Sequence, residues 1–82
     1  MTQLEKLVAK LRTARGDSSY ADVRRLLEAN GWRLHRQHGS HVIYVREPAE
    51  PINFPLIGGR HVRREYVKGI IRRLESEGAL DG

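Results

Sequence analysis

The sequence predicts an α+β domain in which helices cover one face of a three-stranded antiparallel sheet. Three segments have apolar residues at helical spacing, and between the second and the third the apolar period changes to two, as in a strand. The element order is helix, helix, three strands, helix, which is an αβββα unit with an extra N-terminal helix. We assign residues 1–17 to this helical extension and residues 18–82 to the αβββα domain.

Size and composition narrow the possible classes of protein. The chain has 82 residues and no cysteine, so it holds one small core and neither a disulfide framework nor a thiolate site. No apolar run approaches the roughly 18 residues of a membrane span, and the polar N-terminus does not resemble a signal peptide. We therefore expect a small, basic, cytoplasmic protein and exclude a large cofactor enzyme.

The first two helices are predicted by apolar stripes with end signals. Apolar side chains one turn apart lie on one face of residues 4–11, and Gly16 ends that helix. Ser19, with Asp22 three residues later, resembles a capping box at the start of the second helix. Gly31 ends the second helix because glycine adopts the left-handed conformation without a Cβ clash. The inner stripe of this helix is expected to consist of Val23, Leu26 and Leu27.

The middle of the chain has the period of a sheet. Alternation of apolar and polar residues predicts strands over residues 32–37, 40–46 and 52–54. His38-Gly39 is the expected two-residue turn between the first two strands. Pro55 lacks a donor N–H, so the third strand is expected to be short or to lie at an edge.

This turn determines which side chains of the hairpin share a face. It places Arg36 directly opposite His41, at the rim of the core-facing side. Tyr44 then lies on the open face of the sheet, where its ring is available to stack on a base. The apolar side chains expected to point together into the core are Trp32, Leu34, Ile43 and Val45.

The last helix is predicted by one further apolar stripe. Gly69 lies inside this helix and costs about 1 kcal/mol relative to alanine, which is tolerable if something packs closely there. The stripe consists of Tyr66, Val67, Ile70, Ile71 and Leu74.

The formal charge of +5 (15 basic minus 10 acidic residues) is concentrated in two blocks. Residues 32–46 carry +3 from three arginines, and residues 60–73 carry +5 from six basic residues and one acidic residue. Such clustering is typical of a phosphate-binding surface, although a solvated helix face has the same pattern. The residues of the second block that recur every four positions, and so form a basic stripe, are Arg60, Arg64, Lys68 and Arg72.

Several motifs resemble the HicA toxin family. Residues 20–32 match the family's opening helix, which ends in glycine followed by a large aromatic residue. Residues 36–41 (RQHGSH) contain the Gly-Ser-His signature of the family, and Phe54-Pro55 matches a strand that ends at a proline. With the C-terminal helix, the resemblance covers about residues 19–76.

The resemblance implies a fold and an activity. The family consists of toxins of type II toxin–antitoxin systems with an αβββα fold similar to double-stranded-RNA-binding domains. Its members cleave mRNA without a metal, stop translation and are neutralised by a co-encoded HicB antitoxin, which here would cover the His41 site. The family's catalytic histidine corresponds to His41. Many members have a second histidine where Ile57 stands in this chain, and the nearest candidate here is His61.

Cleavage of RNA gives each candidate residue a task. RNA brings its own nucleophile, the 2′-OH, so the reaction needs a group that takes its proton, and an imidazole does this near neutral pH. We expect His41 to act as general acid or base and Arg36 to bind the phosphate through paired donors. Ser40 is expected to fix the turn or the substrate. The basic stripe, through Arg64, Lys68 and Arg72, is expected to contact the same RNA backbone, and the alternative for it is an acidic antitoxin.

Other interpretations of the same residues remain. His35, His38 and His41 recur every three residues, but His35 and His41 point to opposite faces of the expected hairpin, so we expect no metal and no cofactor. A non-catalytic RNA-binding module of the same fold has the same charge. A helix-turn-helix DNA-binding protein would use the first two helices, but it has no need of the strands over residues 32–54.

Overall fold

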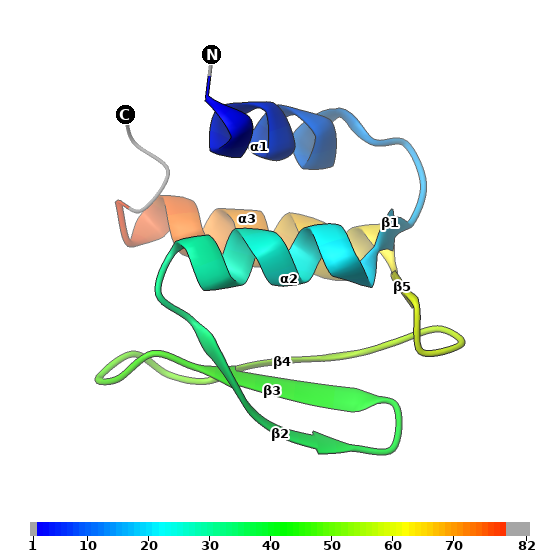
Figure 1. Ribbon diagram of the computed structural model, residues 1–82, viewed down its shortest axis with the longest axis vertical. Coiled ribbons are helices and arrows are strands. Elements are labelled where there is room, and N and C mark those ends of the chain that lie inside the picture. Colours follow the sequence, from blue (N-terminus) through cyan, green and yellow to red (C-terminus); the bar gives the residue numbers. More distant parts are fainter. Residues whose placement is uncertain (1, 79–82) are drawn as a thin grey trace.

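The computed structural model describes residues 2–78, and its elements form three layers (Figure 1). Helices α2 (Tyr20–Ala29) and α3 (Arg64–Ser76) form the middle layer. A three-stranded sheet lies on one side of them, and helix α1 (Gln3–Thr13) lies on the other side. The predicted αβββα order with an extra N-terminal helix is confirmed.

The sheet is antiparallel, with strand order β2-β3-β4. Its strands are β2 (Arg33–His38), β3 (His41–Val45) and β4 (Ile52–Pro55). As expected from Pro55, β4 is short and lies at an edge. The sequence did not predict a second, two-residue ladder, in which β1 (Ser18–Ser19) pairs with β5 (His61–Val62). This ladder joins the start of α2 to the start of α3, and its segments are too short to show a period.

Helix α1 shares the core of the other elements. Its first turn has a full capping box, in which the Thr2 hydroxyl accepts from the Glu5 N–H at 3.1 Å and the Glu5 carboxylate accepts from the Thr2 N–H at 3.1 Å. Leu7 and Leu11 are buried in the same cluster as the stripes of α2 and α3. The extension expected over residues 1–17 is therefore packed on the domain. Residues 79–82, at the end of the expected domain 18–82, lie outside the described residues.

Helix α2 starts and ends where the sequence predicts. The Ser19 hydroxyl accepts from the Asp22 N–H at 3.1 Å, which caps the helix. The Asp22 carboxylate lies 2.8 Å from Lys10 Nζ and so forms an ion pair between α2 and α1. Gly31 has φ of +86° at the end of the helix, as expected. The predicted inner stripe of Val23, Leu26 and Leu27 is buried.

Aromatic side chains fill the space between the helices and the sheet. Tyr44 and Phe54 stack with ring centroids 6.0 Å apart. Trp32 is buried, as predicted, but it precedes β2, and its backbone N–H donates to the Leu27 carbonyl at 2.9 Å. The Arg73 guanidinium lies 5.5 Å from the centre of the Trp32 ring, which is a cation–π contact from α3.

The hairpin turn lies one residue later than the sequence analysis placed it. His38 pairs with His41, so the turn residues are Gly39 and Ser40. Gly39 has φ of +61°, whereas Ser40 has negative φ, and these signs are those of a type II′ turn. A type II′ turn takes glycine at its first central position, because that position needs positive φ. The prediction of a His38-Gly39 turn is therefore wrong.

The later turn reverses the faces of β3. Val42 and Tyr44 point into the core and are fully buried, while Ile43 and Val45 are half-buried on the outer face. An irregularity between Leu34 and Arg36 also changes the alternation of β2, and Leu34 is 45% exposed. The predicted core positions of Ile43 and Val45 are wrong, because a shift of one residue exchanges the two faces of a strand. Leu34, opposite Tyr44, stays on the helix-facing side but is not buried.

Two glycines should respond in opposite ways to alanine. A Cβ on Gly69 meets no atom within 4 Å, so the expected close packing is absent there, and G69A should stabilise the fold by about 0.5–1 kcal/mol. A Cβ on Gly31 lies 3.3 Å from Arg46 Nε at a positive φ, so G31A should destabilise it by more than about 1 kcal/mol. Urea unfolding followed by the fluorescence of Trp32, the only tryptophan, measures both. A loss of stability in G69A would contradict the open surroundings of this residue.

Candidate functional site

The outer face of the sheet is turned away from the helices and carries the predicted catalytic residue. Directly opposed residues of an antiparallel sheet point to the same face, so the pairing of β2, β3 and β4 arranges this face in rows. The row nearest the turn is His38, His41 and Pro55; the next is Arg36, Ile43 and Asn53; the third contains Arg33 and Val45.

His41 and Arg36 share this face, as predicted, but the detail differs. Arg36 is opposite Ile43 and not opposite His41. It is therefore a diagonal neighbour of His41, and the Cα atoms of such neighbours are about 7–8 Å apart. The face is also the solvent side and not the core side. His41 and Arg36 are both exposed, which leaves the imidazole and the guanidinium accessible to a large ligand.

The charge of the outer face is positive. Among residues 2–78, no carboxylate lies within ion-pair distance of Arg36, while Arg33 lies 3.8 Å from the Glu47 carboxylate with both side chains exposed. An exposed pair of this kind contributes little to stability. Half-buried Ile43 and Val45 lie between these charges. The face therefore combines imidazole and guanidinium groups with a small apolar surface.

Ser40 is a structural part of the turn. Its carbonyl accepts from the Leu56 N–H at 2.7 Å, which fastens the turn to the segment after β4. This bond holds the start of β3 against the end of β4. The residue is exposed, and its hydroxyl is next to His41 in the chain.

The sequence analysis gave His38 no part in the reaction, and the structure places it directly opposite His41. The incorrect turn assigned His38 to the loop and placed Arg36, instead of His38, opposite His41. A preference of two-residue hairpin loops for Gly-Ser, with glycine first, is the signal that finds the correct register.

Arg64, a predicted RNA contact, forms hydrogen bonds within the protein. Its Nη1 donates to the Leu11 carbonyl at 2.6 Å and its Nη2 donates to the Arg12 carbonyl at 2.8 Å. These are end carbonyls of α1 that lack partners within the helix. The Arg64 N–H also donates to the Asp17 carboxylate at 3.3 Å. Arg64 therefore fastens α1 to α3.

Lys68 and Arg72 remain exposed, but they lie far from His41. Together with Arg12 they line a hollow of about 310 Å³ between α1 and α3. The layer of α2 and α3 separates this side of the molecule from the outer face of the sheet (Figure 1). The basic stripe and the His41 face are thus two surfaces separated by the helix layer, and their joint contact with one RNA stays a prediction.

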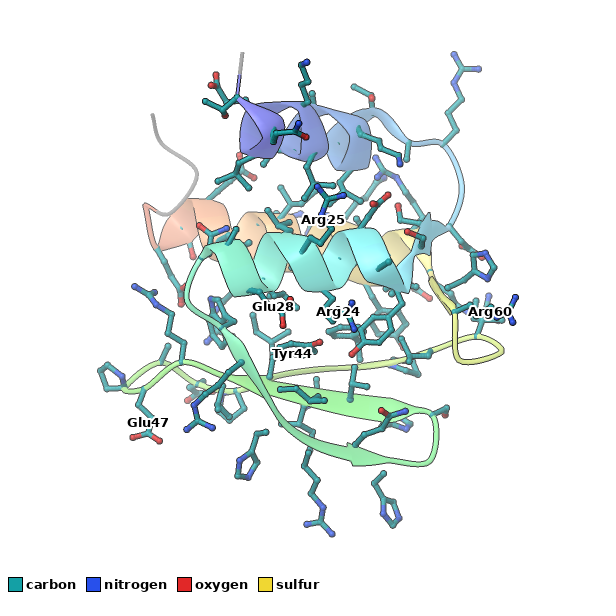
Figure 2. All side chains as sticks on the ribbon, viewed as in Figure 1. Arg24, Arg25, Glu28, Tyr44, Glu47 and Arg60 are labelled. Carbon is teal, nitrogen blue, oxygen red and sulfur yellow. The ribbon has the colours of Figure 1, made fainter. Side chains whose placement is uncertain are left out.

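His61 and Arg60 belong to a third surface. His61 lies on β5 opposite Ser19, and it lines a hollow of about 450 Å³ with Arg24 and Arg60 near the start of α2. Figure 2 shows Arg60 on the loop beside this hollow. His61 is therefore not on the sheet that carries His41.

Tyr44 is not available to stack on a base, which corrects the sequence prediction. Its ring is fully buried, and its hydroxyl lies 2.7 Å from the Tyr20 hydroxyl. Burial, followed by this hydrogen bond, raises the pKa of Tyr44 far above its usual value. Figure 2 shows Arg24 and Glu28 on the side of α2 that is turned toward Tyr44.

The described part of the chain was expected to hold no metal site and no membrane span. Within residues 2–78, no three histidine, aspartate or glutamate side chains gather as a metal site requires. None of the described helices is both long and apolar enough to cross a bilayer.

Comparison with known proteins gives one match. A family model described as the HicA toxin of bacterial toxin–antitoxin systems matches residues 20–75, which include α2, the sheet and most of α3. No curated protein and no solved structure matches. The matched segment contains His38, Ser40 and His41 and leaves α1 outside.

The capping role of Arg64 is tested against its neighbour on the stripe. R64M removes two charge-assisted bonds from carbonyls of α1 and should lower the free energy of unfolding by about 2 kcal/mol. K68M removes an exposed charge and should change it by less than about 0.5 kcal/mol. Urea unfolding of both variants gives the comparison. Equal effects would show that Arg64 does not fasten α1.

Proposed function

Because the chain belongs to the HicA toxin family of bacterial toxin–antitoxin systems, we propose that it is a metal-independent ribonuclease that cleaves mRNA and thereby inhibits translation. The observation that carries this proposal is the position of His41. It is exposed on an open sheet face, beside arginines, where a polyanionic strand has access to it.

The proposed reaction uses the 2′-OH of the RNA as the nucleophile. His41 acts as general acid or base, because imidazole both takes and gives protons near neutral pH. Arg36, diagonal to His41 and without an ion pair among the described residues, binds the phosphate and stabilises the charge that develops on it. The Ser40 hydroxyl, adjacent to His41, contacts the substrate. No metal and no cofactor takes part.

Lys68 and Arg72 are proposed to contact the RNA backbone away from the cleaved bond. They are exposed and line a basic hollow on the side of the molecule opposite the sheet. Phosphate contacts of this kind weaken as salt concentration rises. The Arg64 guanidinium also borders this hollow, but it donates to the Leu11 and Arg12 carbonyls.

The partner proposed for the His41 face is a HicB-like antitoxin encoded beside the toxin. Membership of a toxin–antitoxin family implies an antitoxin. The outer face offers it positive charge from Arg33 and Arg36 and a half-buried apolar centre of Ile43 and Val45. We place toxin, antitoxin and mRNA together in the cytoplasm.

A non-catalytic RNA-binding module is the alternative, since the positive sheet face would bind RNA with or without a proton transfer. The two functions differ in one measurement. A binding module protects or shifts RNA on a gel without cutting it.

The His41→Ala variant tests the nuclease. It should lower the cleavage rate of purified mRNA by at least about 100-fold, the range of a general acid–base group, while its circular dichroism stays that of the parent. H61A is the matched control, because His61 is exposed on another surface. Parent cleavage should persist in EDTA and stop on RNA with a 2′-deoxy nucleotide at the cut. RNA binding without any cleavage by the parent would support the alternative.

The antitoxin assignment is tested in cells and with purified proteins. Expression of the parent should arrest growth, and co-expression of the adjacent antitoxin should restore it. The purified antitoxin should block modification of His41 by diethyl pyrocarbonate and leave that of His61 unchanged, as mass spectrometry of the peptides would show. Equal protection of both histidines, or of neither, would contradict binding at the outer face.

A further inference from the structure

The Gly39-Ser40 turn brings two histidines together on the outer face of the sheet. His38 ends β2, His41 begins β3, and the two residues are directly paired. Opposed residues of an antiparallel pair have Cβ atoms about 4.5–5.5 Å apart and point to the same side. Both residues are exposed, so both imidazoles are accessible to the same ligand.

This juxtaposition is fixed by the local structure. A two-residue turn leaves no freedom in the register of the residues beside it. The Ser40 carbonyl is bonded to the Leu56 N–H at 2.7 Å, and the Gln37 side chain donates to the Gly39 carbonyl at 3.4 Å. The turn is therefore held by β2 and by the segment after β4, and the histidine pair is held with it.

Cleavage of RNA through its 2′-OH needs two proton transfers. One group takes the proton of the 2′-OH as its oxygen bonds to phosphorus. As the bond from phosphorus to the 5′-oxygen breaks, a second group gives a proton to that leaving oxygen. The products are a 2′,3′-cyclic phosphate and a 5′-OH, and the protons balance because one group gains what the other loses. A single imidazole cannot be next to both oxygens, which lie on opposite sides of the phosphorus.

We propose that His38 is the second proton-transfer group of this site, so that His38 and His41 form an acid–base pair on one phosphodiester. This assignment rests on the proposed ribonuclease function. The spacing of the pair places one imidazole on each side of a phosphate, with Arg36, two residues from His38 on the same face, next to its charged oxygens.

The other charged groups of this face do not fit the task. Arg33 and Arg36 carry guanidinium groups, which suit phosphate binding and not proton transfer. The Glu47 carboxylate lies beyond the end of β3, at the opposite end of the strand from His41, and it contacts Arg33. No described helix packs against β2 and β3 on this side, because α2 and α3 cover the inner face. His38 is the titratable side chain in the row of His41 among residues 2–78.

The first test is the rate of RNA cleavage by the His38→Ala and His38→Gln variants. Each should be at least about 100-fold slower than the parent, while RNA binding and the urea midpoint stay close to the parent values. H35A is the matched control, since His35 is also exposed on β2 but lies in the irregular part of the strand without a pairing partner. It should cleave at the parent rate. A parent-like rate of both His38 variants would overturn the assignment.

The second test separates proton transfer from a merely structural role. The parent should show a bell-shaped dependence of cleavage on pH, and H38A and H41A should each lose one limb of it. A substrate with sulfur in place of the 5′-oxygen needs no proton on its leaving group. It should restore most of the rate in only one of the two alanine variants, the one that lacks the general acid. Rescue of both variants, or of neither, would overturn the assignment.

The outcomes also distinguish this assignment from the function on which it rests. If the parent does not cut RNA, the ribonuclease proposal fails and the His38 assignment fails with it. If the parent cuts RNA, depends on His41 and tolerates the loss of His38, the ribonuclease proposal stands and the His38 assignment alone is overturned.

Discussion

The two-residue turn at Gly39 and Ser40 is the constraint on which both the core and the candidate site depend. Positive φ at Gly39 closes the turn, and the turn fixes the register of β2 against β3. That register sends Val42 and Tyr44 into the core, where Tyr44 stacks on Phe54. It sends the alternate residues of the same strand, His41 among them, to solvent. The same register therefore buries the packing residues of β3 and exposes His41.

The order of the elements was predictable from periodicity, but the faces of the hairpin were not. Residues 42–45 (VIYV) are apolar without interruption, so burying either alternate pair satisfies the pattern. Which pair is buried is determined by the position of the turn, and glycine is preferred at the first position of that turn. The irregularity at His35 adds a second change of alternation, which no periodic pattern shows. The prediction that His41 is the catalytic residue does not depend on the register, because it rests on the tripeptide that contains it.

The basic stripe illustrates a different limit of sequence analysis. Periodicity places Arg64, Lys68 and Arg72 on one side of α3, and the structure agrees. It does not show that Arg64 is bonded to two carbonyls more than fifty residues earlier in the chain. An arginine that caps another helix and an arginine that binds a phosphate have the same spacing in the sequence. Only the position of α1, which lies outside the matched segment, separates them.

The outer face of the sheet is open to solvent, and its openness limits what can bind there. A pocket selects a substrate by enclosing it, and a small inhibitor can fill it. An open row of side chains on β2, β3 and β4 selects instead for a molecule that is long enough to lie across several strands, as an RNA strand is. Control of such a surface requires shielding its whole area at once, which favours a folded macromolecule over a metabolite. A partner protein can cover such a face, whereas a small molecule covers only part of it.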